Sequence, residues 1–145
     1  EVESSAETIS AVDSAIAAAE KLPATPEAVE SLGAGWVAEE ALAIALFCSL
    51  KANDFASGVL LAVNHGGDSD STGSLTGNLL GTLMGVESIP TEWVDNLEGH
   101  EIIEEVARDL WLHFVEPPTW LDPNARVTEE SRRLGEAEFQ RYPPW

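Results

Sequence analysis

The apolar residues in the first half of the chain are spaced as they are on the faces of α-helices. Within residues 5–20 they recur every three or four positions, which predicts an amphipathic helix. Residues 36–52, "WVAEEALAIALFCSLKA", are apolar around most of a helix's circumference, so they are expected to form a central core helix. Asp54 stands where it can cap a further helix over residues 55–64.

Residues 71–85 also have a helical pattern, but a glycine occupies every fourth place. Each glycine lowers the stability of a helix by about 1 kcal/mol relative to alanine, so close packing has to offset this cost. Such spacing lets helices approach closely in membranes, but the polar residues of this segment favour a soluble bundle. We expect the backbone to press against a neighbouring helix along the glycine stripe, which is Gly73, Gly77, Gly81 and Gly85. Apolar contacts on the other faces are expected from Leu75, Leu79, Leu80, Leu83 and Met84.

The remaining segments complete an all-helical pattern. Residues 99–114 predict an amphipathic helix, and residues 22–35, with two prolines and two glycines, predict a connection that holds at most one helical turn. Residues 117–145 contain five of the eight prolines. No segment alternates as a β-strand does. The sequence therefore predicts an all-α fold, a helical bundle over residues 1–116 followed by a Pro-rich C-terminal extension over 117–145.

The composition narrows the range of partners. Asp and Glu number 26 against 7 Lys and Arg, a net charge of −19, which repels nucleic acid and anionic membrane surfaces and attracts cations. The single cysteine, Cys48, lies in an apolar run and is expected to be a buried, unreactive thiol. No apolar run reaches the roughly 18 residues that a membrane span requires, and no signal peptide is evident, so a cytoplasmic location is expected.

The stretch "VNHGGDSDSTG" contains the residues with the most specific chemistry. Asp68 and Asp70 precede the glycine-striped helix, and a helix cap explains one carboxylate but not two. Clustered carboxylate and hydroxyl oxygens are typical ligands of hard cations such as Mg²⁺, Mn²⁺ or Ca²⁺. An EF-hand is excluded because its twelfth position would be Leu79 instead of a glutamate.

Asp68, Asp70 and the Ser71 hydroxyl cannot fill the roughly six coordination places of Mg²⁺. The stretch therefore predicts half of a metal site. His65, beside this loop, either supports the ligands by donating a hydrogen bond or is exposed to solvent.

Three stretches in this order closely resemble the C-terminal half of the ADP-ribosylglycohydrolases, the family that includes dinitrogenase-reductase-activating glycohydrolase. They are "LGAGWVAEEALAIALFCSL", "DFASGVLLAVNHGGDSDSTGSLTGNLLGTLMG" and "HEIIEEVARDL", and the resemblance covers roughly residues 27 to 110. It implies an all-α fold, two divalent cations, Mg²⁺ or Mn²⁺, and hydrolysis of the bond between ADP-ribose and a protein side chain or a related acceptor. The expected partners are thus ADP-ribosylated proteins or small molecules that contain ADP-ribose.

By this resemblance, Asp68, Asp70 and Ser71 match the family's C-terminal metal-ligand motif. The loop with Gly35 and Trp36, together with Glu39, matches a region that lines the substrate cleft. The catalytic residue stays unassigned, because the family's Thr-Asp-Asp motif and catalytic glutamate, both in its N-terminal half, have no counterpart in this sequence.

The chain is therefore expected to be a truncated or separately encoded portion that is inactive without the missing N-terminal half, which would be a further partner. Two alternatives remain open at this point. The chain could be a non-catalytic remnant that binds metal, ADP-ribose or a protein partner, or a plain helical interaction fragment without a ligand.

Overall fold

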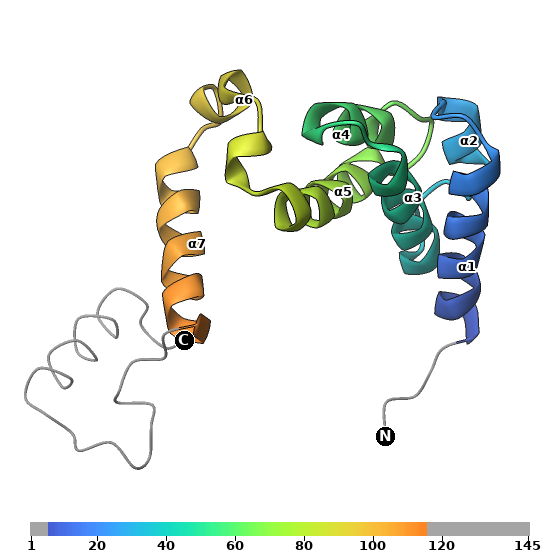
Figure 1. Ribbon diagram of the computed structural model, residues 1–145, viewed down its shortest axis with the longest axis horizontal. Helices are drawn as coiled ribbons and strands as arrows, with labels where there is room; N and C mark the ends of the chain where they lie inside the picture. Colours follow the sequence, from blue (N-terminus) through green and yellow to red (C-terminus); the bar gives the residue numbers. More distant parts are fainter. Residues whose placement is uncertain (1–5, 116–145) are drawn as a thin grey trace, which may run out of the picture. The chain divides into compact units, whose positions relative to one another are not determined.

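The structure, a computed structural model, describes residues 6–115, with side chains for residues 6–111. This part of the chain is helical throughout and contains no strand, which confirms the predicted all-α class (Figure 1). The elements are α1 (Ala6–Lys21), α2 (Pro26–Glu30), α3 (Ala38–Lys51), α4 (Phe55–Val63), α5 (Ser69–Met84), the 3-10 turn η1 (Val86–Ser88), α6 (Thr91–Asp95) and α7 (His100–Val115).

Two compact units divide between Asn96 and Leu97. The first contains α1 to α6, and the second contains α7, a helix whose Glu104 and Arg108 lie 3.5 Å apart on its exposed surface. The predicted extension over 117–145 lies outside the described residues. None of the described helices combines the length and the apolar character that a membrane crossing needs.

Local signals set where the helices of the first unit begin. The connection before α3 holds one short helix, α2, whose first residue is Pro26 and whose cap is Thr25, with Oγ1 accepting a hydrogen bond from Ala28 N–H at 3.4 Å. Asp54 caps α4 as predicted, because its Oδ1 accepts the Ser57 N–H at 2.7 Å. These hydrogen bonds from Ser57 lower the pKa of Asp54.

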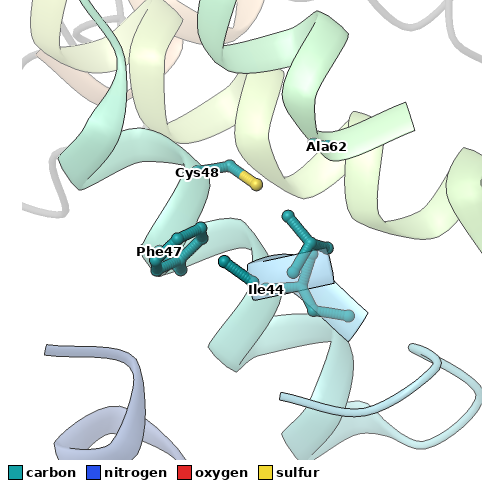
Figure 2. Packing of buried hydrophobic residues seen from close by; sticks show 6 residues of the cluster. Ile44, Phe47, Cys48 and Ala62 are labelled. Carbon is teal, nitrogen blue, oxygen red and sulfur yellow. The ribbon is translucent and has the colours of Figure 1, made fainter. Parts of the chain in front are cut away.

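Helix α3 is the centre of the first unit, as its apolar circumference predicts. It packs against α1, α2, α4 and α5. Ile44, Phe47 and Cys48 of α3 are fully buried and lie against Ala62 of α4 (Figure 2). Burial raises the pKa of the Cys48 thiol to about 12, because the apolar surroundings disfavour the thiolate. The predicted buried, unreactive state of this cysteine agrees with both observations.

Helix α3 begins at Ala38, two residues later than the pattern predicts. Val37 has an extended backbone with φ −118° and ψ 153°, so Trp36 and Val37 belong to a loop that precedes the helix. This loop includes the residues that the sequence assigns to the substrate cleft. The difference matters because the direction of the Trp36 side chain is set by the conformation of the loop and not by the helical repeat.

The glycine stripe of α5 faces side chains of α4, but the packing is very close only at its first position. A Cβ at Gly73 would lie 2.6 Å from Cγ1 of Val63, too near for a real contact. At Gly77 and Gly81 a Cβ would be in ordinary contact with the Phe55 ring, at 3.9 and 4.0 Å. Gly85 follows the helix and has φ +82°, a left-handed conformation that favours glycine. Close approach therefore explains one of the four glycines.

The apolar side chains of α5 are also less buried than the sequence pattern predicts. Leu80 is fully buried between α5 and Gly58 of α4, whereas four others remain between 37% and 76% exposed: Leu75, Leu79, Leu83 and Met84. The expected apolar contacts on the other faces are thus wrong for these four residues within the described part of the chain. The helices that the structure packs against α5, α3 and α4, cover only one side of it.

The glycine stripe yields a stability prediction. Gly77→Ala should raise the free energy of unfolding by about 0.5–1 kcal/mol, because alanine favours the helix and the added methyl group meets only an ordinary contact with Phe55. Gly73→Ala should give no gain or a loss, because the Val63 side chain has to move. Urea unfolding of the two variants measures this difference, and equal gains would contradict the packing described for Gly73.

Candidate functional site

Two loops meet at the N-terminal end of α5. The first loop, residues 33–37, precedes α3, and the second loop, residues 64–68, follows α4. The backbone N–H of Asp68 donates a hydrogen bond of 2.8 Å to the carbonyl oxygen of Ala34. A Cβ at Gly67 would overlap that carbonyl group, so only glycine permits the two backbones to lie this close. The loops are therefore joined backbone to backbone.

The carboxylate of Glu40 holds the first loop. Its Oε2 accepts two hydrogen bonds, from the backbone N–H groups of Ala34 and Gly35, both at 3.1 Å. Gly33 and Gly35 have φ of +123° and +80°, which turns these two amides toward the same oxygen. Glu40 is the third residue of α3, the position from which a glutamate reaches back over the start of its own helix.

His65 and Thr72 hold the second loop. The Gly67 N–H donates to His65 Nδ1 at 3.1 Å, so Nδ1 is unprotonated and Nε2 carries the hydrogen. His65 Nε2 then donates to Thr72 Oγ1 at 3.0 Å, and the buried Thr72 hydroxyl donates to the Ala62 carbonyl at 2.8 Å. The half-buried ring thus holds the loop backbone and Thr72, and its expected role as a donor to metal ligands stays a prediction.

Asp68, Asp70 and Ser71 converge beside these loops. Asp68 occupies the cap position of α5, but its side chain makes no capping hydrogen bond. Its pKa is lowered, chiefly by a hydrogen bond with the Asp70 carboxyl group and next by one from the Ser71 hydroxyl. The Asp70 and Ser71 side chains thus lie near the Asp68 carboxyl group, and helix capping does not account for its position.

An open groove of about 540 Å³ runs between the first loop and α5. One wall includes Gly35 and Trp36, and the other includes Asp68 and Ser71. The Trp36 side chain is 72% exposed, so its ring is available to a planar ligand group. The structure thus brings Gly35, Trp36, Asp68 and Ser71 to the same groove, whereas Asp70 is not among the residues that line it.

Glu39 has a different position from the other predicted site residues. It lines a second groove, of about 520 Å³, between α1 and the start of α3, together with Glu40 and residues such as Ser10 and Ser14. Successive residues of a helix point about 100° apart, so Glu39 and Glu40 cannot serve the same loop equally. Glu40 is the residue that contacts the first loop.

Comparisons with known proteins show the family of this chain. The family model for ADP-ribosylglycohydrolase matches residues 1–119. The chain belongs to the ADP-ribosylglycohydrolase family. No solved structure matches it significantly.

Individual relatives match parts of this family member. The ADP-ribosylarginine hydrolase Tri1 of Pseudomonas putida is 35% identical over 72 residues, which are 50% of this chain and 19% of the relative. The ADP-ribosyl-[dinitrogen reductase] glycohydrolase of Rhodospirillum rubrum is 46% identical over 56 residues, 39% of this chain and 19% of the relative. The human ADP-ribosylhydrolase ARH3 is 26% identical over 99 residues, 61% of this chain and 27% of the relative. The chain therefore spans about a fifth to a quarter of the length of these relatives.

The donors of this family member fit a hard cation in kind but fall short in number. Carboxylate and hydroxyl oxygens are the ligands that Mg²⁺ and Mn²⁺ prefer. Among residues 6–111, however, no three His, Cys, Asp or Glu side chains come together in a way that holds a metal ion. Asp68, Asp70 and Ser71 are thus suited to part of a coordination shell, and further oxygen ligands have to come from water or from other parts of a polypeptide.

The convergence of the two carboxyl groups can be tested by titration. Asp68 should titrate below its ordinary pKa of 3.8, and Asp70→Ala should raise the Asp68 pKa toward that value because the main hydrogen bond is lost. Carboxyl ¹³C NMR follows the titration directly. The lowered pKa stabilises the folded state above the unfolded pKa, and this contribution is lost as the pH falls through the folded pKa. An Asp68 titration that Asp70→Ala leaves unchanged would show that the carboxyl groups lie apart in solution.

Proposed function

We propose that this chain forms part of the active site of a metal-dependent ADP-ribosylglycohydrolase, which hydrolyses the glycosidic bond between ADP-ribose and a protein side chain or a related acceptor. The main support is the groove that has Asp68 and Ser71 on one wall and Gly35 and Trp36 on the other. This arrangement offers oxygen ligands for a cation and a flat apolar surface within one ligand's reach. Family membership supplies the reaction class.

Each side of the groove would contribute a separate function. Asp68, Asp70 and Ser71 would hold divalent cations, and the exposed Trp36 ring would contact a planar part of the ligand. Two bound Mg²⁺ or Mn²⁺ ions would orient the ribose hydroxyls and stabilise negative charge that develops on oxygen. An aspartate engaged with a cation is not free to act as a general base, so we assign the catalytic acid or base to neither aspartate.

The full site needs residues beyond those described. The sequence contains no Thr-Asp-Asp motif, and no three His, Cys, Asp or Glu side chains among the described residues are grouped so that they could hold a metal ion. We therefore propose that the chain alone does not hydrolyse ADP-ribosyl bonds and that the N-terminal half of the family fold supplies the remaining ligands. The exposed apolar residues of α5 leave room for such a neighbour.

The shortage of ligands favours one alternative function. A family member without a complete metal site can still act as a non-catalytic helical unit that binds a metal ion, ADP-ribose or a protein partner. The groove beside Trp36 exists in either case. The two functions differ in turnover and not in binding.

Metal binding tests the proposed role of the aspartates. The chain should bind Mn²⁺ weakly, with a dissociation constant on the order of 0.1 to 1 mM, because few charged ligands surround the ion. Asp70→Ala should weaken this binding at least tenfold, whereas Asp13→Ala, which removes an exposed carboxylate from α1, should leave it unchanged. The electron paramagnetic resonance signal of free Mn²⁺ reports the bound fraction. Equal Mn²⁺ affinity of the unaltered chain, Asp70→Ala and Asp13→Ala would show that Asp70 is not a metal ligand.

Turnover separates the enzyme from the non-catalytic alternative. We expect no release of ADP-ribose from ADP-ribosylated arginine by the chain alone with Mg²⁺ or Mn²⁺. Addition of a polypeptide that carries the N-terminal half of the family fold should restore hydrolysis, and it should do so less with Asp70→Ala. Metal binding without any turnover in the reconstituted mixture would support the non-catalytic alternative.

A further inference from the structure

One peptide unit connects Glu40 with Asp68. The peptide between Ala34 and Gly35 directs its N–H toward Glu40 Oε2 at 3.1 Å, and its carbonyl oxygen accepts the Asp68 N–H at 2.8 Å. In a trans peptide the N–H and C=O groups point in opposite directions, and the described chain contains no cis peptide. A single rigid plane therefore has Glu40 on one side and the Asp68 backbone on the other.

The position of this plane is fixed at both ends. Rotation of this plane would break both the Gly35 N–H bond to Glu40 and the Asp68 N–H bond to the Ala34 carbonyl. The Ala34 N–H, which belongs to the preceding peptide, donates a further hydrogen bond to the same Glu40 oxygen. A Cβ at Gly33 would lie 2.5 Å from Glu40 Cδ, which shows that the glutamate side chain lies directly over this glycine. On the other side, a Cβ at Gly35 would lie 3.5 Å from the Asp68 Cβ, which shows that Gly35 lies beside the Asp68 side chain.

The same plane also sets the direction of Trp36. Trp36 follows Gly35 immediately and is 72% exposed, so the contacts of its ring with the rest of the protein restrain it little. Its position along the groove depends on the backbone that precedes it. Glu40 thus determines where both walls of the groove stand, although the structure does not place it among the residues that line this groove.

From this geometry we propose that Glu40 is a positioning residue, which holds the Ala34–Gly35 peptide so that Trp36 and the Asp68 carboxylate face one ligand. This role rests on the proposed function for its metal and ADP-ribose, but the geometry can be examined without either. Glu40 does not line the groove itself, so it would act on a ligand only through the backbone of the first loop.

The test compares three variants of the full chain. Glu40→Ala removes the acceptor of both N–H groups, and Glu40→Gln keeps an oxygen that can accept both. Asp54→Ala is the matched control, because it removes a carboxylate that also accepts a backbone N–H, but at the start of α4 and away from the groove. The readouts are the ¹⁹F resonance of 5-fluorotryptophan at position 36, assigned with Trp36→Phe, the ¹³C resonance of the Asp68 carboxyl group, and Mn²⁺ affinity.

We expect Glu40→Ala to shift or broaden both resonances and to weaken Mn²⁺ binding by about 10- to 100-fold, the usual effect of losing a residue that orients metal ligands. Glu40→Gln should restore both resonances and most of the affinity. Asp54→Ala should lower the thermal stability but leave the two resonances and the affinity as in the unaltered chain.

The outcomes distinguish this inference from the proposed function. Resonances of Trp36 and Asp68 that do not respond to Glu40→Ala, or that respond equally to Asp54→Ala, would overturn the positioning role. If the unaltered chain binds no Mn²⁺, the proposed metal site fails, and the two resonances still decide the role of Glu40.

Discussion

The hydrogen bond from the Asp68 N–H to the Ala34 carbonyl joins two loops that are distant in sequence, and the candidate site depends on it. It forms only because Gly67 has no side chain where the two backbones meet. A backbone bond of this kind contributes about 1 kcal/mol to stability, a modest amount. Its larger effect is geometric, because it sets the groove wall that contains Trp36 against the wall that contains Asp68. Glu40 holds the first loop through two backbone N–H groups. His65 holds the second loop through hydrogen bonds with Gly67 and Thr72.

The core supports this arrangement through α3. Phe47 and Ile44 are fully buried, and each contributes roughly 1.5–3 kcal/mol through the removal of apolar surface from water. The first loop leads directly into α3, and the second loop lies between α4 and α5, which both pack against α3. The loops are therefore held by the same helix that forms the core. Ligand positions in metal sites have to be kept within about 0.5 Å, and rigid helices at the base of the loops meet this need.

The charge of the chain and the exposed apolar surface of α5 both bear on the proposal that further polypeptide completes the site. A chain with a net charge of −19 places Asp68 and Asp70 side by side, where a bound cation would relieve their repulsion. The leucines at positions 75, 79 and 83 form an exposed apolar strip on α5, on the helix that begins at these aspartates. The chain covers about a fifth to a quarter of the length of its relatives. These three observations together support the proposal that additional polypeptide completes the metal site.

The sequence by itself determined the features that depend on neighbouring residues. The helix over 36–52 as the core, the Asp54 cap and the buried Cys48 follow from repeat, capping and composition, each of which acts within one segment. The grouping of Asp68, Asp70 and Ser71 was equally visible, because the three residues lie within one turn. Whether they bind a metal stays a prediction.

Only the tertiary structure decided the contacts between segments. It showed that Glu40 accepts the hydrogen bonds of the first loop, and that Glu39 lines the groove beside α1 and not the groove beside Trp36. It also showed that just one stripe position, Gly73, is tightly packed and that Leu80 alone of the α5 leucines is fully buried. A sequence pattern specifies which face of a helix is apolar. Which neighbour covers that face, and how closely, depends on how the helices pack, and this information is not contained in any single segment.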